Sequence, residues 1–162
     1  GDGVVYVVPG FYEGGGSYVL DESFSSAATP NAQAAVAILG ASGDELGKLA
    51  SAGDLNNDGS LDLLIGAPGY DSERGAAYVL YLGPDHWSDW WDPASGEARA
   101  SIDLVQAVED EQSIARIYST ESERLGTLVD SVGDVSGDGV DDILVGPSED
   151  GGTLRVFFGG GT

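Results

Sequence analysis

The stretch GDLNNDGSLDLLIGAPG (residues 53–69) decides the fold expected for this chain, because it joins two unlike segments. Its first ten residues hold five acidic or amide side chains, and the residues that follow are almost all apolar. A weaker copy, GDVSGDGVDDILVGPSE (residues 133–149), comes later in the chain. An acidic loop joined to a hydrophobic strand is therefore a repeated unit of this sequence.

The repeat extends beyond the acidic loops on both sides. Residues 44–69 parallel residues 122–148, and GAAYVLYLG (residues 75–83) resembles GTLRVFFGG (residues 152–160). GVVYVVPG (residues 3–10) is a third copy of that last segment, and the three copies start 72 and 77 residues apart. Repetition of this kind is typical of solenoids and propellers.

Each complete unit is expected to hold four short strands. In the middle unit they lie near Lys48–Asp54, Leu61–Gly66, Ala76–Leu82 and Ser113–Tyr118. The second is almost continuously apolar, as expected for a strand that is buried on both faces. The alanine-rich run Ala34–Leu39 could be helical, but its alignment with the fourth strand favours a strand. Because long amphipathic helix patterns are missing, the sequence predicts an all-β fold.

The strongly acidic composition limits which partners the protein can bind. The chain has 162 residues, with 28 acidic and six basic side chains and a formal net charge of −22. Such a surface repels nucleic acid and anionic membranes, and bound cations would relieve its self-repulsion. The sequence has no cysteine and no apolar run long enough to insert into a membrane. We therefore expect no nucleic-acid partner and no membrane insertion.

The two acidic loops are candidate metal sites. Oxygen-bearing residues stand at positions 1, 3, 5 and 9 of each loop, and position 7 can offer its backbone carbonyl. Oxygen-only ligands in a flexible loop favour Ca²⁺, so we expect two calcium sites. The predicted ligands are Asp54, Asn56, Asp58, Ser60 and Asp62 in the first loop, and Asp134, Ser136, Asp138, Val140 and Asp142 in the second.

Two other interpretations compete with calcium binding by these loops. Asp, Asn and Gly are also ordinary turn residues, so a loop of this kind can be free of metal. An EF-hand needs a glutamate at position 12 and flanking helices, whereas Ile65 and Val145 stand there between predicted strands. The EF-hand is thereby excluded, and the metal-free turn remains the alternative.

The loops and their flanks resemble the FG-GAP repeats of integrin alpha-subunit propellers and bacterial surface proteins. Leu46-Gly47 and Leu125-Gly126 stand where the family has Phe-Gly, Gly66-Ala67-Pro68 matches its second motif, and Gly146-Pro147 lacks the alanine. The resemblance implies blades of four antiparallel strands, with a structural Ca²⁺ between the first and second strands. It also implies an extracellular or cell-surface location, with the periplasm as an alternative.

The chain would supply only about two and a quarter blades of such a propeller, whereas closed propellers usually have four to eight. We expect a partial blade in residues 1–43 and a full blade in residues 44–121, with a long connection over residues 83–112. A second partial blade follows in residues 122–162. A segment of a longer propeller is the favoured interpretation, and a self-assembling partial propeller is the alternative.

Signals of catalysis are sparse. His86 is the one histidine, and the sequence has neither a nucleophile elbow nor a phosphate-binding glycine loop. A carboxylate pair of the glycosidase type depends on spatial distances that a sequence does not give. We therefore expect a non-catalytic protein.

The long connection over residues 83–112 is either functional or contains a short extra element, because structureless loops of this length are uncommon. It holds Trp87, Trp90 and Trp91, which either cap a blade or form a binding surface. We therefore expect an adhesion, assembly or protein-interaction module, whose partners are proteins or further blades. The alternative is a carbohydrate-binding or carbohydrate-processing module that uses the tryptophans on a glycan.

Overall fold

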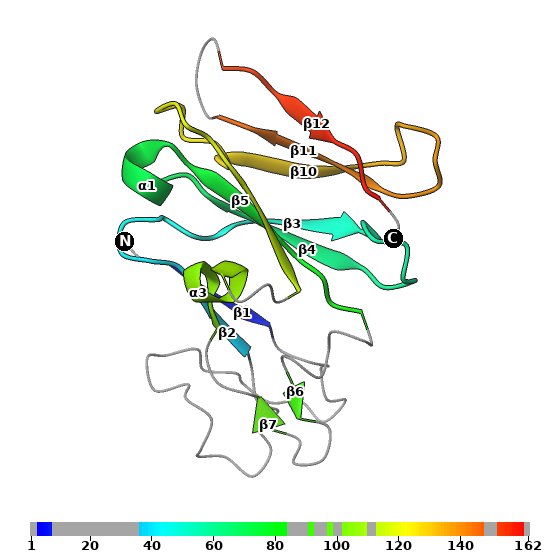
Figure 1. Cartoon of the computed structure of the whole chain (residues 1–162), viewed down its shortest axis with the longest axis horizontal. Helices are drawn as coiled ribbons and strands as arrows, with labels where there is room; N and C mark the ends of the chain where they lie inside the picture. The colour runs from blue at the N-terminus through cyan, green and yellow to red at the C-terminus, as the bar shows by residue number, and fades with distance from the viewer. Residues whose placement is uncertain are drawn as a thin grey trace, which may run out of the picture.

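The computed structural model describes residues 3–7, 36–83, 91–92, 97–98, 102–109, 113–147 and 152–160. Within them the regular elements are mostly β-strands, joined by loops and accompanied by two short helices (Figure 1). In chain order the elements are β1 (Val4–Val7), β2 (Val36–Leu39), β3 (Lys48–Gly53), β4 (Asp62–Ala67), α1 (Tyr70–Glu73), β5 (Ala76–Leu80), β6 (Trp91–Asp92), β7 (Glu97–Ala98), β8 (Ile102–Asp103), α3 (Leu104–Glu109), β9 (Ile114–Tyr118), β10 (Leu128–Gly133), β11 (Asp142–Gly146) and β12 (Arg155–Phe157).

The middle sheet has the complete four-stranded form that the sequence predicts. Its order is β3-β4-β5-β9, and every neighbouring pair is antiparallel. Five of the six residues of β4 are buried, because both of its faces are covered by other elements. The all-β prediction and the four strands of the middle unit are thereby confirmed.

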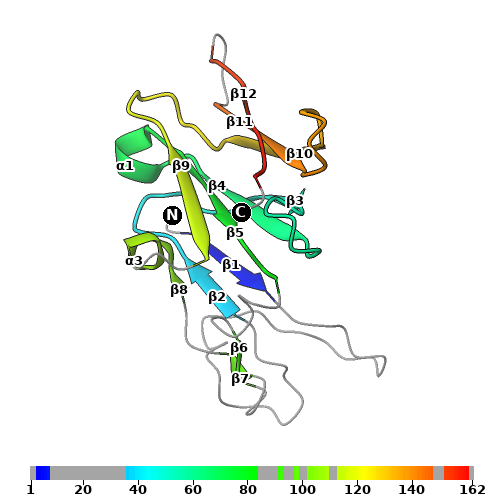
Figure 2. The same ribbon diagram turned by 45° about the vertical axis from the view of Figure 1, so that its right-hand side comes forward.

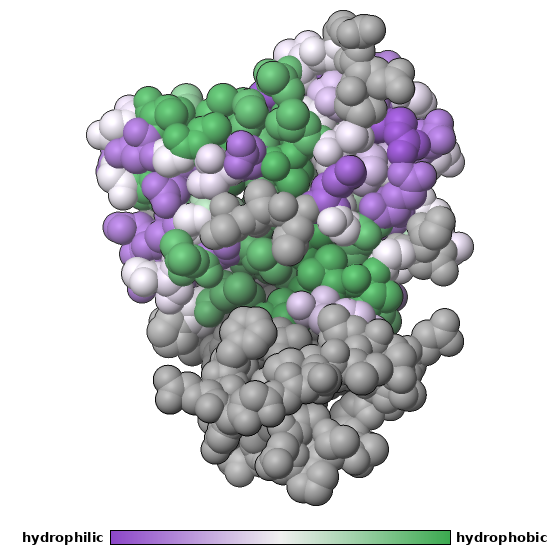
Figure 3. Space-filling model, turned by 180° about the vertical axis from the view of Figure 1, so that it is seen from behind, coloured by the Kyte–Doolittle hydropathy of each residue, from purple (hydrophilic) through white to green (hydrophobic). Residues whose placement is uncertain are grey.

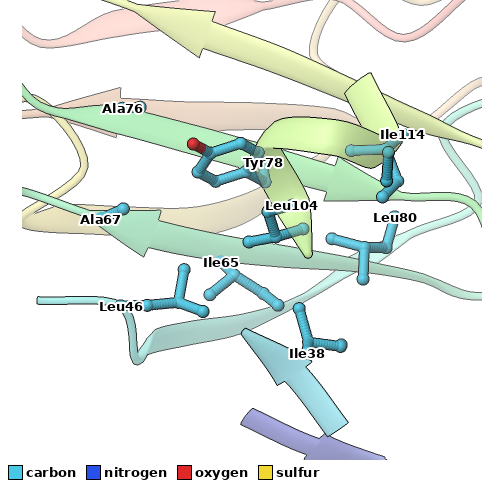
Figure 4. Close-up of a cluster of buried hydrophobic side chains, with 10 residues drawn as sticks. Ile38, Leu46, Ile65, Ala67, Ala76, Tyr78, Leu80, Leu104 and Ile114 are labelled. Atoms are coloured by element: carbon cyan, nitrogen blue, oxygen red, sulfur yellow. The ribbon is translucent and has the colours of Figure 1, made fainter. Parts of the chain in front are cut away.

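The two faces of the middle sheet enter two separate hydrophobic cores. Ile65, Tyr78 and Leu80 point to one core, which also contains Ile38 of β2 and Leu104 of α3 (Figure 4). Leu64 and Val79, which alternate with them, point to a second core shared with β11 and β12. Because successive strand residues face opposite sides, one apolar strand serves two interfaces. The sheets therefore stack face to face, as blades do.

The first core receives an unexpected contribution from the long connection. β8 joins the first sheet, whose order is β1-β2-β8, and pairs with β2 in parallel. The following helix, α3, buries Leu104 and Ala107 against the middle sheet. A short extra element was one of the two outcomes expected for this connection, and over residues 102–109 it is present.

The last sheet has three strands in the order β10-β11-β12 (Figure 2). Ile143 and Val145 of β11 are buried in the second core. Residues on the opposite face of this sheet stay exposed, among them Leu128 and Val156. Among the helices in the described ranges, none has the length and apolar character needed to cross a bilayer.

Backbone contacts between neighbouring sheets explain the glycines of the repeat. A Cβ on Gly75 would lie 2.2 Å from backbone atoms of Leu125, and one on Gly3 would lie 2.1 Å from the Leu46 carbonyl oxygen. Leu46 and Leu125 are the equivalent leucines of the two Leu-Gly motifs, and both are buried. Each Leu-Gly turn therefore packs against a glycine at the start of the preceding sheet's third strand.

Asp44 is a buried carboxylate at the start of the middle unit. It accepts a hydrogen bond from the Ala41 N–H at 3.1 Å, and its own carbonyl accepts the Gly69 N–H at 3.0 Å. Burial raises the pKa of Asp44 above its ordinary value of 3.8, and the negative charge of Asp103 adds to the increase. Folding therefore disfavours the charged form of this side chain relative to the unfolded chain.

Asp44→Asn is expected to raise the free energy of unfolding at pH 7. A carboxyl group whose pKa is higher in the folded state lowers stability as the pH rises from 3.8 through the folded pKa. Asparagine keeps an oxygen for the Ala41 N–H but carries no charge. The difference in free energy of unfolding between the variant and the wild type should therefore grow as the pH rises from 3.8 through the folded pKa. Urea unfolding of both proteins between pH 4 and pH 7 measures it, and a pH-independent difference would contradict this account.

Candidate metal centre

The first acidic loop connects β3 to β4 and is closed around Asp54. The Asp54 carboxylate accepts hydrogen bonds from the backbone N–H groups of Asp58 at 3.0 Å and Gly59 at 2.8 Å. Two residues of this tight turn have left-handed backbone angles, Asn57 with φ 61° and Gly59 with φ 86°. Asparagine and glycine tolerate that conformation best, which explains why they stand here.

The second loop, between β10 and β11, repeats this geometry. Asp134 accepts hydrogen bonds from the N–H groups of Gly137 at 2.6 Å, Asp138 at 3.1 Å and Gly139 at 2.8 Å. These bonds, led by the one from Gly139, lower the pKa of Asp134, because they favour the charged carboxylate. The two loops thus have the same type of turn, closed by the aspartate at position 1, in neighbouring sheets, as the repeat predicts.

The carboxylates at position 9 are buried and anchor each loop to the following strand. Asp62 accepts the Leu55 N–H at 2.9 Å and the Leu82 N–H at 3.2 Å. Burial raises the pKa of Asp62, and the charges of Asp58 and Asp54 raise it further. A cation beside this carboxylate would offset both effects.

Asp142 has the same place in the second loop. It accepts N–H groups of Val135 at 2.9 Å, Ser136 at 3.0 Å and Gly159 at 2.9 Å, and it is fully buried. Position 9 therefore has a structural role in both loops whether or not a metal is bound.

The side chains at positions 3 and 5 lie nearer the surface. The Asn56 amide donates to the Asp58 carboxylate at 3.0 Å, and the other Asp58 oxygen accepts the Ser60 N–H at 2.8 Å. In the second loop Asp138 accepts the Val140 N–H at 3.0 Å.

The donor chemistry of both loops fits a hard divalent cation, because only oxygen ligands are present. The candidate ligands, however, are not gathered as closely as a metal site requires. Within the part of the chain that the structure describes, no three acidic, histidine or cysteine side chains are gathered closely enough to form a metal-binding group. The predicted ligands of each site do lie in one loop, but the loop is held in shape by hydrogen bonds between its carboxylates and backbone N–H groups. Calcium binding therefore stays a prediction.

One contact between the two loops was missed by the sequence analysis, which did not single out Asp141. The Asp141 carboxylate accepts the Asp54 N–H at 3.3 Å, and the Asp141 N–H donates to the Asp54 carbonyl at 3.2 Å. The Gly160 N–H adds a third link, to the Leu55 carbonyl at 3.1 Å. The two acidic loops are therefore tied together. The available signal was that position 8 is Asp141 in one loop and Leu61 in the other.

Asp141→Ala is expected to lower the free energy of unfolding by about 1–2 kcal/mol, because it removes a partly buried hydrogen bond between two sheets. The melting temperature should fall by roughly 2–8 °C for a chain of this size. Asp130→Ala is the matched control, since that aspartate is exposed and, among the described residues, its side chain bonds to the neighbouring Ser131 N–H and not to another sheet. If both variants melt alike, Asp141 does not join the loops.

The tryptophan hypothesis falls mainly outside the described residues. His86, Trp87 and Trp90 are not among them, and Trp91 begins β6, whose backbone pairs with β7 in the register Trp91↔Ala98. Whether the three indole rings come together stays a prediction, as does a role in binding.

The comparisons with known proteins point to one family. The model of the FG-GAP repeat matches residues 47–80, which include the first acidic loop and strands β4 and β5. Integrin alpha-6 from Homo sapiens is 31% identical to this chain over 111 residues, or 65% of the chain. The aligned part is 8% of that integrin's length, so the similarity concerns a small portion of the larger protein.

Proposed function

We propose that this chain, which belongs to the integrin-like FG-GAP repeat family, is a calcium-stabilised, non-catalytic module for adhesion or protein interaction at the cell surface. The observation that carries the proposal is that two of the hydrogen bonds at positions 1 and 9 recur at equivalent residues of the two acidic loops. In each, the aspartate at position 1 closes the turn, and the buried aspartate at position 9 anchors it.

The role assigned to calcium follows from the electrostatics. Each loop holds several carboxylates in a chain whose formal net charge is −22, so a bound cation would relieve repulsion at both places. The residues that would hold it are Asp54, Asn56, Asp58, the Ser60 carbonyl and Asp62, and their equivalents Asp134, Ser136, Asp138, the Val140 carbonyl and Asp142. The ion would supply only charge and coordination, and the chain's own residues fix the turn.

The interaction role is supported by the family and by the architecture. Integrin-like FG-GAP domains are typically extracellular, and the similarity to an integrin alpha subunit favours protein partners or further blades. Long connections on a rigid β scaffold are common places for binding. We therefore assign recognition to the connections and support of the scaffold to the acidic loops.

A binding array tests this proposal directly. The purified chain is applied to extracellular-matrix proteins and glycans, once with Ca²⁺ and once with a chelator. We expect binding to protein spots that disappears with the chelator. Binding only to glycans, lost in a Trp87/Trp90/Trp91→Ala variant, would overturn the protein-interaction role and favour carbohydrate recognition. Cleavage of an arrayed glycan would contradict the non-catalytic assignment.

A further inference from the structure

The two acidic loops lie side by side at the same end of neighbouring sheets (Figure 1). The first connects β3 to β4, the second connects β10 to β11, and β3 contacts β10. In the space-filling view from behind, hydrophilic residues lie along this edge of the molecule (Figure 3). The two candidate metal sites are therefore neighbours, and each can affect the other through the residues between them.

Asp141 of the second loop fixes the backbone of Asp54, the first candidate ligand of the first loop. The Asp54 N–H donates to the Asp141 carboxylate at 3.3 Å, and the Asp54 carbonyl accepts the Asp141 N–H at 3.2 Å. In its own loop, Asp141 stands between Val140 and Asp142, the candidate ligands at positions 7 and 9. One residue therefore connects candidate ligands of both loops.

A second connection runs through the segment that follows β12. The Gly160 N–H donates to the Leu55 carbonyl of the first loop at 3.1 Å. The Gly159 N–H donates to the Asp142 carboxylate of the second loop at 2.9 Å. The packing is close, because a Cβ on Gly159 would lie 2.3 Å from the Asp141 carbonyl oxygen. The bases of the two loops are therefore expected to move together.

The turns themselves are closed by exposed hydrogen bonds. The Gly59 N–H donates to the Asp54 carboxylate and the Gly139 N–H to the Asp134 carboxylate, both at 2.8 Å. Exposed backbone hydrogen bonds of this kind open more readily than those of buried strands. When the first turn opens, Asp54 is released and its two bonds to Asp141 are weakened. Opening of one loop therefore lowers the free energy needed to open the other.

We propose that Asp141 couples the two acidic loops, so that they open and close together and a divalent cation held by one loop strengthens binding in the other. The second half of this inference rests on the proposed calcium function and deepens it. Coupling of this kind is reciprocal, because the two binding free energies are linked. Repulsion between two cations opposes it, but each loop holds at least three carboxylates, and salt at about 0.15 M screens charges over about 8 Å.

Hydrogen exchange in the presence of a chelator tests the coupling without metal. We expect Asp141→Ala to speed the exchange of the Gly59 and Gly139 N–H groups by about fivefold or more, because neither turn is then supported by the other. Asp141→Asn keeps an oxygen that can accept the Asp54 N–H and should restore most of the protection. Wild-type exchange at both glycines in the Asp141→Ala protein would overturn the proposal.

Two controls separate coupling from a general loss of stability. The Gly75 N–H donates to the Tyr70 carbonyl at 2.9 Å at the opposite end of the middle sheet (Figure 1), and its exchange should not change. Asp130→Ala removes the same charge from an exposed position of β10 and should leave both loops as they are in the wild type. Equal acceleration at Gly75 in the Asp141→Ala protein would contradict coupling between the loops.

Calorimetric titration with Ca²⁺ tests the effect on binding. Asp138→Ala leaves only the first loop to bind the ion, and Asp58→Ala leaves only the second. Without coupling, the product of the two association constants of the wild type equals the product of the two single-loop constants. We expect the wild-type product to be larger by about fivefold or more, and the excess to disappear when all three proteins also carry Asp141→Ala.

The coupling and the calcium function can fail separately. Equal products in the wild type would refute coupling of the two cations, and an excess that survives Asp141→Ala would refute the role of this residue. No binding of Ca²⁺ by the wild type would refute the proposed calcium function and the binding half of this inference. The hydrogen exchange would then still decide whether the loops open together, so the two failures are distinguishable.

Discussion

Gly66→Ala is expected to lower the free energy of unfolding by about 2–3 kcal/mol and the melting temperature by roughly 4–12 °C. The added Cβ would lie 1.9 Å from the Gly126 carbonyl oxygen of the next sheet. That oxygen cannot move away easily, because the Gly126 N–H is bonded to the Gly146 carbonyl at 3.1 Å. The sheets would have to separate at the point where the Gly-Ala-Pro motif meets the next Leu-Gly turn.

Gly146→Ala is the matched control for this substitution. Gly146 is the repeat equivalent of Gly66, but the nearest atom to a Cβ there would be Leu154 Cδ2, at the end of an exposed side chain. Neither glycine has a positive φ, so backbone strain does not separate the two. Calorimetry of both variants measures the difference. Equal losses of stability would show that the contact between Gly66 and Gly126 does not lock the sheets.

Removing calcium is expected to have the other large effect. A ligand at a hundred times its dissociation constant stabilises the folded state by about 2.7 kcal/mol for each site, so two sites would contribute about 5 kcal/mol. The melting temperature in Ca²⁺ should therefore exceed that in a chelator by roughly 10–20 °C. The physical reason is that the cation offsets repulsion among the carboxylates of each loop.

Asp58→Ala and Asp138→Ala test this effect one loop at a time. Both side chains are exposed, and the bonds described above, to Asn56 and Ser60 and to Val140, lie within the loops themselves. Each variant should keep about half of the stabilisation by calcium and resemble the wild type in chelator. Asp62 and Asp142 are poorer choices, because both also accept backbone N–H groups that are buried or partly buried. Equal melting in Ca²⁺ and in chelator would refute the stabilising role.

Internal repetition explains why much of this structure could be predicted from the sequence. Two copies of one local pattern constrain each other, so the acidic loops, the apolar second strand and the third strand could be placed without a structure. Hydrophobic continuity in LDLLIG also predicted a strand buried on both faces, and β4 is such a strand.

The features that escaped prediction are contacts between distant segments. The bond between Asp54 and Asp141 joins residues 87 positions apart. The parallel pairing of β8 with β2 likewise brings the middle connection onto the first sheet. Neither leaves a periodic signal in the chain, because both depend on how the sheets stack. The binding role expected of the three tryptophans stays a prediction, because binding depends on a surface and not on a local pattern.

The central claim is that each acidic loop binds one calcium ion and thereby supports the stack of sheets. Isothermal titration calorimetry of the chelator-stripped chain with Ca²⁺ measures this directly, with the Asp58→Ala variant beside the wild type. Our account predicts two ions bound by the wild type and one by the variant. No saturable heat from the wild type, or the same stoichiometry in both proteins, would contradict it.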